Sequence, residues 1–169
     1  MMRRRVGTTT CELGVRRAAR YDRRMPIQGD YEPSPWKFAA DQVALYEATG
    51  GVEGGTLQGK AVVILSTPGR HSGKVRKTPL MRVEHNGAYA VVASMGGAPK
   101  HPVWYLNLIA SPAVTLQDGR NVYEMGAREV HGDEKARWWA LAVAAWPPYT
   151  DYQAKTDRQI PVVVLEPRE

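Results

Sequence analysis

The chain has 169 residues, of which 43% are hydrophobic and 24% charged, a composition typical of a globular domain with its own core. No apolar run approaches the roughly 18–20 residues needed to cross a bilayer, which argues against a transmembrane protein. Eight arginines lie within residues 1–24, opposed only by Glu12 and Asp22, so this segment accounts for the whole net charge of +6. The remaining residues are balanced in charge, and we therefore expect no nucleic-acid partner.

The sequence shows no pattern of a metal site or a disulfide framework. Cys11 is the only cysteine, which excludes a disulfide within the chain and a cysteine-based metal site or nucleophile in the core. The four histidines, His71, His85, His101 and His131, lack the spacing of metal ligands. We predict that the protein binds no metal.

Residues 1–24 are rich in arginine and contain no apolar stretch of the kind found in secretory signals. We predict a disordered basic extension. A second hypothesis places the natural translation start at Met25. Residues 25–169 are predicted to form a single domain.

The first predicted element is a helix. Ser34-Pro35 combines an N-cap residue with a proline at the first helical position, and apolar residues at helical spacing continue from Trp36 to Tyr46. Gly50-Gly51 ends this helix. Residues 60–67 form a β-branched run that predicts a buried strand, and residues 68–75 form a loop.

Two hairpins and the helices between them are predicted next. Residues 76–84 and the alternating stretch up to Met95 are joined by Asn86-Gly87, a type I′ turn sequence. Gly96-Gly97 interrupts the chain before a short helix over residues 102–109. The second hairpin joins residues 114–118 to 121–130 through Asp118-Gly119.

The C-terminal part is predicted to contain a helix from Gly132 to Pro147-Pro148, a helical turn at residues 149–156 and a strand at 160–165. Strands linked by hairpins, with helices between them, favour an antiparallel α+β fold curled into a barrel. Strands and helices do not alternate as βαβ units, which argues against a Rossmann fold.

One loop concentrates polar chemistry. Cations and a hydroxyl lie within eight positions that follow Gly69 and include Gly73: Arg70, His71, Ser72, Lys74, Arg76 and Lys77. Such a loop can bind a phosphate or carboxylate, but a solvated hairpin tip has the same composition, and the residues alone leave both interpretations open. A Walker loop is excluded because Pro68 and Val75 replace the required glycine and hydroxyl residue.

Two further segments favour a ligand site. The glycines in Ser94–Lys100 allow close approach to the backbone, and the helix beginning at Pro102 offers free N–H groups to an anion. Trp146, Tyr149 and Tyr152 surround two prolines and can either cover a flat ring or seal the core.

From Trp36 to Pro167, the chain resembles the actinobacterial split-barrel proteins of the deazaflavin-dependent nitroreductase family. Three ordered stretches carry the resemblance: LSTPGRHSGKVRKTPL at 65–80, ASMGGAPKHPVWYLN at 93–107 and YTDYQAKTDRQIP at 149–161. The resemblance implies a mainly β split barrel of the FMN-binding type, an antiparallel sheet with flanking helices. It also implies the use of the deazaflavin coenzyme F-420, which has a tricyclic ring, a phosphate and a polyglutamate tail.

The resemblance also implies which residues line the site. The cofactor-binding residues would be Arg70, His71, Ser72, Arg76, Lys77, Thr78, Pro79, Leu80, Met81, Val92, Ala93, Ser94, Met95, Val103, Trp104, Tyr105, Leu106, Asn107 and Tyr149. Tyr149 would also be the catalytic residue, and Trp146, Tyr149 and Tyr152 would shape the substrate side. Well-known members have lysine in place of His71 and Met95, asparagine in place of Thr78, and the nitroimidazole-activating member has tyrosine in place of Met81 and Trp146.

The function implied is hydride transfer from reduced coenzyme F-420 to a quinone, an activated alkene or a nitroaromatic compound. Two alternatives are an FMN-dependent oxidoreductase on the same barrel and a non-catalytic deazaflavin carrier. We expect a cytoplasmic monomer or homodimer, and a quinone substrate would bring it into peripheral contact with a membrane, through the first helix or the arginine-rich segment.

Overall fold

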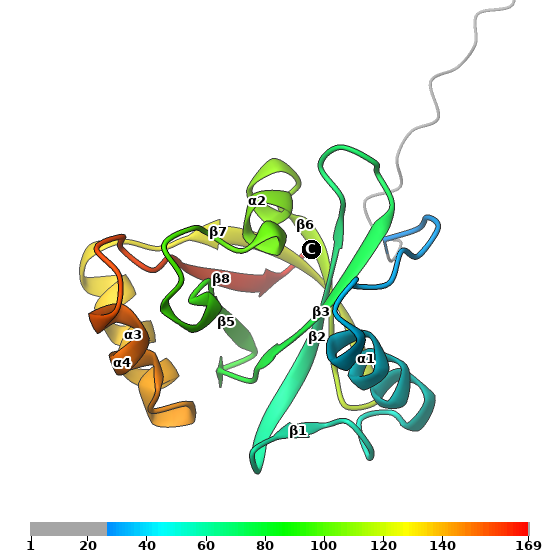
Figure 1. The fold of residues 1–169 in the computed structure, drawn as a ribbon, viewed down its shortest axis with the longest axis horizontal. Coiled ribbons are helices and arrows are strands. Elements are labelled where there is room, and N and C mark those ends of the chain that lie inside the picture. The colour runs from blue at the N-terminus through cyan, green and yellow to red at the C-terminus, as the bar shows by residue number, and fades with distance from the viewer. Residues whose placement is uncertain (1–26, 169) are drawn as a thin grey trace, which may run out of the picture.

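The computed structural model describes residues 27–168, so the predictions for residues 1–24 and for a start at Met25 lie outside the described residues. All strand pairs are antiparallel, and the sheet order is β1-β2-β6-β7-β8-β5-β4, with β3 paired to β2 (Figure 1). The strands are β1 (Thr56–Leu57), β2 (Lys60–Pro68), β3 (Val75–Met81), β4 (Glu84–His85), β5 (Ala88–Val92), β6 (Ala113–Asp118), β7 (Asn121–Glu129) and β8 (Val162–Pro167).

Helices flank the curled sheet. They are α1 (Lys37–Thr49), α2 (Val103–Ala110), α3 (Gly132–Ala145) and α4 (Tyr149–Ala154), and a 3-10 turn, η1, spans Met95–Gly97. Helix α1 lies against β3, α2 against β2 and β7, and α3 against β5 and β8 (Figure 1). The predicted antiparallel α+β architecture, mainly β with flanking helices, is therefore confirmed.

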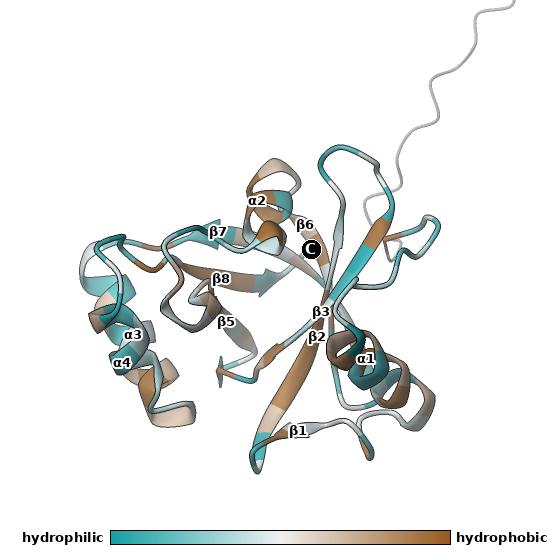
Figure 2. Cartoon of the chain, viewed as in Figure 1, coloured by the Kyte–Doolittle hydropathy of each residue, from teal (hydrophilic) through white to brown (hydrophobic). Residues whose placement is uncertain are grey.

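The hydrophobic core contains three clusters, of which the two larger ones are separated by the sheet and the smallest lies between α1 and β2. Strand β8 contributes Val163 and Leu165 to one cluster and Val162 and Val164 to the other, so both of its faces are buried. This explains why its sequence is a continuous apolar run rather than an alternating one, visible as brown ribbon in Figure 2. The second cluster also contains Trp146 and extends to α3 and α4.

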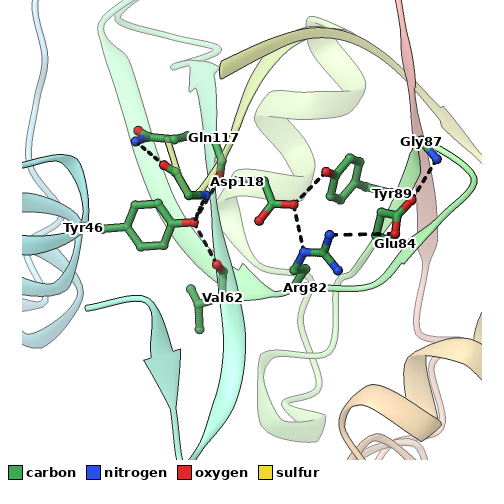
Figure 3. A network of polar contacts seen from close by, with 9 residues as sticks. Tyr46, Val62, Arg82, Glu84, Gly87, Tyr89, Gln117 and Asp118 are labelled. Atoms are coloured by element: carbon green, nitrogen blue, oxygen red, sulfur yellow. Dashed lines mark hydrogen bonds and ion pairs between the residues drawn. The ribbon is translucent and has the colours of Figure 1, made fainter. Parts of the chain in front are cut away.

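A polar network links strands that are distant in the sheet order. Asp118, at the end of β6, accepts hydrogen bonds at 2.8 Å from Arg82 Nε and from the Tyr89 hydroxyl on β5 (Figure 3). The Tyr46 hydroxyl of α1 donates to the Val62 carbonyl at 3.1 Å and accepts from the Gly119 N–H at 2.7 Å. These contacts hold the curl of the sheet and fix α1 on it.

The first helix differs from its prediction at the N-terminus. It begins at Lys37 with Trp36 in the N-cap position, and the Ser34 hydroxyl accepts a hydrogen bond from the Trp36 N–H at 3.1 Å. Ser34 therefore stabilises a turn before the helix instead of capping it. Trp36, the first residue of the apolar helical pattern, is 71% exposed. The predicted end is confirmed, because Gly50 adopts a left-handed conformation with φ 62°.

Some strand boundaries also differ. The strand predicted over residues 76–84 ends at Met81, and residues 82–83 lie outside regular structure before β4. The strand predicted to reach Met95 ends at Val92, and the short strand β1 was missing from the prediction. The type I′ turn is confirmed by positive φ at Asn86 (52°) and Gly87 (81°).

Candidate functional site

A cavity of about 710 Å³ lies between α1 and β3 on one side and the start of α2, the end of β5 and α4 on the other. This volume is within the range of about 300–1,000 Å³ found for small-molecule sites. The predicted site residues that line it are Arg76, Lys77, Thr78, Pro79, Leu80, Met81, Val92, Ser94, Met95, Val103, Trp104, Asn107, Trp146, Tyr149 and Tyr152. Three segments that are far apart in sequence thus meet at one cavity.

Six predicted residues lie outside the cavity wall. His71 and Ser72 are exposed on the loop between β2 and β3, and Ala93 is fully buried in the core. The Tyr105 side chain turns to β7, where its hydroxyl donates to Glu129 at 3.0 Å. Arg70 and Leu106 also stand outside the wall. Side-chain direction along α2 places Tyr105 and Leu106 away from the cavity although Trp104 and Asn107 line it, whereas Arg70, His71 and Ser72 belong to a loop that does not reach the wall.

The loop between β2 and β3 is nevertheless tied to the site. The Arg70 N–H donates a hydrogen bond to the Asn107 Oδ1 at 3.1 Å. Asn107 is 3% exposed and lines the cavity, so it joins the loop to helix α2 at the cavity wall. The resemblance pointed to both residues, but their contact depends on the tertiary fold.

Sequence reasoning missed one side of the cavity. This side consists of the segment before α1, the first turns of α1, and two separate residues: Glu32, Ser34, Pro35, Trp36, Phe38, Ala39, Gln42, Leu57 and Pro102. The two aromatic residues Trp36 and Phe38 were the available sequence signal for this side. In the structure their ring centroids lie 6.1 Å apart, and both side chains are more than half exposed at the rim of the cavity.

The two cations of the cavity wall carry carboxylate partners. Arg76 Nη2 lies 2.8 Å from Glu32 Oε2, and Lys77 forms an ion pair with Glu47. Lys77 Nζ also lies 4.8 Å from the ring centroid of Tyr31. Both cations are partly buried at one edge of a mainly apolar cavity, which suits a ligand with an anionic group attached to a flat apolar part.

Tyr149 brings a polar group to the opposite wall. The residue is 5% exposed, its ring lies 6.1 Å from that of Tyr152, and no residue among 27–168 forms a hydrogen bond with its hydroxyl. Burial raises the pKa of Tyr149 above the ordinary value of 10.0, with a smaller contribution from Tyr152. The hydroxyl therefore remains protonated at neutral pH and is available as a donor to a ligand.

Arg158 organises the loop that follows β5. Its guanidinium donates to the carbonyls of Ala93 at 3.0 Å, Ser94 at 2.8 Å and Ala98 at 2.8 Å, and contacts His101 Nδ1 at 3.0 Å. Burial lowers the pKa of Arg158 below its ordinary value. The loop contains three consecutive residues with positive φ, Met95–Gly97, a conformation that requires support from the surrounding structure, and the Arg158 guanidinium supplies part of that support.

Metal binding and membrane spanning can be assessed for the described residues. Residues 27–168 contain no group of three or more histidine, cysteine, aspartate or glutamate side chains arranged to hold a metal ion. Within the same residues, every helix is too short or too polar to cross a bilayer.

Comparison with known proteins identifies the family. Residues 38–167 match the model of the F₄₂₀H₂-dependent quinone reductases, F₄₂₀H₂ being the reduced form of coenzyme F-420. An F₄₂₀H₂-dependent quinone reductase of Mycobacterium tuberculosis is 37% identical over 129 residues, which cover 74% of this chain and 87% of that protein. The chain belongs to the F₄₂₀H₂-dependent quinone reductase family.

Solved structures agree with this assignment. An F₄₂₀H₂-dependent reductase is 57% identical, with a TM-score of 0.60 over 62% of this chain and 93% of that one. A second structure, described as a domain-swapped dimer, is 50% identical, with a TM-score of 0.63 over 75% of this chain and 92% of that one. The split-barrel fold and the resemblance inferred from the sequence are confirmed.

Proposed function

We propose that this protein binds coenzyme F-420 in the 710 Å³ cavity and uses its reduced form to reduce a quinone. The observation that carries the proposal is the combination, in a chain of this family, of apolar walls with two cations at one edge. When bound, reduced F-420 supplies a hydride from C5 of its ring. All other contributions come from the residues of the chain.

The anionic part of the cofactor is assigned to Arg76 and Lys77. A guanidinium presents paired N–H donors to a phosphate, and the lysine adds a point charge. The first turn of α2, from Val103, adds backbone N–H groups that have no partner within the helix. His71 and Ser72 are exposed at the loop tip, and we assign them to the outer, solvated part of the ligand.

The ring is assigned to the apolar part of the wall, where Leu80, Met81, Val92 and Trp104 line the cavity. Trp146 and Tyr152 are proposed to shape the acceptor side. Such walls hold two flat molecules face to face and exclude water, which favours hydride transfer by orientation. Tyr149 is proposed to donate a hydrogen bond to the acceptor oxygen, since its hydroxyl stays protonated.

Turnover with quinones tests this function. Purified protein is mixed with reduced F-420 and a soluble naphthoquinone, and oxidation is followed by the absorbance of the oxidised deazaflavin. We expect oxidation that requires the protein and saturates with quinone. If F-420 binds but no quinone, enone or nitroaromatic compound accepts the hydride, the protein is a carrier. Tight binding of FMN with none of F-420 would favour an FMN enzyme.

We also propose peripheral contact with a membrane surface, which would bring a lipid-soluble quinone to the cavity. The support is an apolar rim in which Trp36 is 71%, Phe38 55%, Met95 60% and Val103 67% exposed. All four line the cavity, so the rim surrounds its mouth. Co-sedimentation with lipid vesicles tests this contact, which should decrease in Trp36→Ser/Phe38→Ser. Absence of co-sedimentation for the unmodified chain would contradict it.

A further inference from the structure

The segment before α1 is attached to the start of β3. Tyr31 forms a parallel bridge with Val75, the Glu32 N–H donates to the Val75 carbonyl at 3.0 Å, and the Val75 N–H donates to the Asp30 carbonyl at 2.9 Å. These backbone hydrogen bonds place Glu32 beside Arg76, the residue that follows Val75. The fold therefore fixes the backbone of residue 32 at the cavity, within reach of the Arg76 side chain.

The carboxylate of Glu32 forms an ion pair with Arg76, the same residue that the proposed function assigns to the anionic part of the cofactor. Glu32 Oε2 lies 2.8 Å from Arg76 Nη2, and both residues line the cavity. The two side chains are 39% and 33% exposed, so water and salt can reach the pair. An ion pair of this kind contributes little to stability, and its role in folding is correspondingly small.

We propose that Glu32 sets the affinity of the site for the anionic part of its ligand, by competing with that anion for Arg76. The inference rests on the proposed function, because it takes a phosphate-bearing cofactor as the ligand. Binding of a phosphate near Arg76 must either displace the Glu32 carboxylate or place two negative charges around one guanidinium. Either event weakens binding relative to a site with a neutral residue at position 32.

The competition predicts an unusual result, namely that removal of a cavity-lining side-chain charge tightens binding. For charges separated by several ångströms near the surface, the effect corresponds to about a threefold to tenfold change in affinity. Screening makes the effect dependent on salt, because the Debye length falls from about 30 Å at 0.01 M to about 3 Å at 1 M ionic strength.

Fluorescence titration of coenzyme F-420 tests the proposal with the full chain, Glu32→Gln and Glu53→Gln. Glu53 is exposed and lies outside the cavity wall, so its replacement makes the same change in net charge away from the site. We expect Glu32→Gln to bind F-420 about three to ten times more tightly at low salt, with a smaller gain at 0.5 M salt. Glu53→Gln is expected to bind within about twofold of the unmodified chain.

Weaker or unchanged binding by Glu32→Gln would overturn the proposal, and weaker binding would show that the ion pair instead prepares Arg76 for the ligand. A thermal unfolding midpoint close to that of the unmodified chain establishes that the variant is folded. If Glu32→Gln is not folded, the test compares Glu32→Asp, which keeps the charge on a shorter side chain, with Glu32→Asn. Glu32→Asp must then bind F-420 less tightly than Glu32→Asn. Failure of the unmodified chain to bind F-420 would instead refute the proposed function.

Discussion

The Arg158 guanidinium donates a hydrogen bond to the Ser94 carbonyl at 2.8 Å, so a residue between α4 and β8 holds the loop that follows β5. Ser94 and Met95 of this loop line the cavity. The loop therefore depends on a contact between residues 64 positions apart. Its geometry is set by the C-terminal part of the chain.

Arg158→Ala is expected to lower the free energy of unfolding by about 2–3 kcal/mol, because several partly buried carbonyls lose their donor. Arg158→Lys should recover only a part of the loss, since an ammonium group cannot reach all of these oxygens. Urea denaturation of the three proteins measures the effect. Equal midpoints for Arg158→Ala and the unmodified chain would contradict the assigned role.

Asn107→Ala is expected to destabilise the protein by about 1–3 kcal/mol, because the Arg70 N–H loses its acceptor beside the cavity. Ile109→Ala is a matched control on the same helix, where the side chain is 50% exposed. Its effect should stay within about 0.5–1 kcal/mol. The comparison uses urea denaturation, and a cost for Asn107→Ala no larger than the control would show that the hydrogen bond is unimportant.

Tyr149→Phe is expected to reduce kcat for quinone reduction by about tenfold to a hundredfold, because the acceptor oxygen loses a hydrogen-bond donor. The raised pKa of Tyr149 keeps the hydroxyl protonated, so its titration should not appear in the rate between pH 6 and pH 9. Steady-state kinetics measure both effects. Tyr123→Phe, on β7 outside the cavity wall, serves as the control. Full activity of Tyr149→Phe would exclude a role for the hydroxyl.

The free energy of unfolding should fall as the pH rises from 10 to 12. Burial and the hydrogen bond to Glu129 raise the pKa of Tyr105 to about 12, whereas the ordinary value of 10.0 applies to the unfolded chain. The unfolded state therefore loses its proton first, and unfolding becomes easier across this window. Denaturation midpoints across the window should fall less steeply in Tyr105→Phe than in the unmodified chain. Identical slopes would contradict this assignment.

Local features of the fold could be predicted from the sequence because their causes are local. The Asn86-Gly87 turn and the end of α1 at Gly50 follow from the tolerance of these residues for positive φ. The start of α1 could not be predicted, since Ser34 offers its hydroxyl to Trp36 in a turn as readily as in a cap.

Much of the site depends on long-range pairing, which local patterns do not specify. The resemblance brought β3, the loop after β5 and Tyr149 together as a candidate site, and the cavity joins them. Glu32 had no sequence signal, because its position depends on the bridge between Tyr31 and Val75. The role of Arg158 likewise follows only from the fold, since its partners lie on a different segment.

The proposed function requires that the cavity bind coenzyme F-420 with its anionic part at Arg76. Fluorescence titration with F-420, run in parallel with FMN, tests it most directly in the unmodified chain and in Arg76→Ala. We expect saturable binding of F-420, tighter than that of FMN, and about a tenfold or greater loss of affinity in Arg76→Ala. Unchanged affinity in Arg76→Ala, or tight binding of FMN without binding of F-420, would contradict the account.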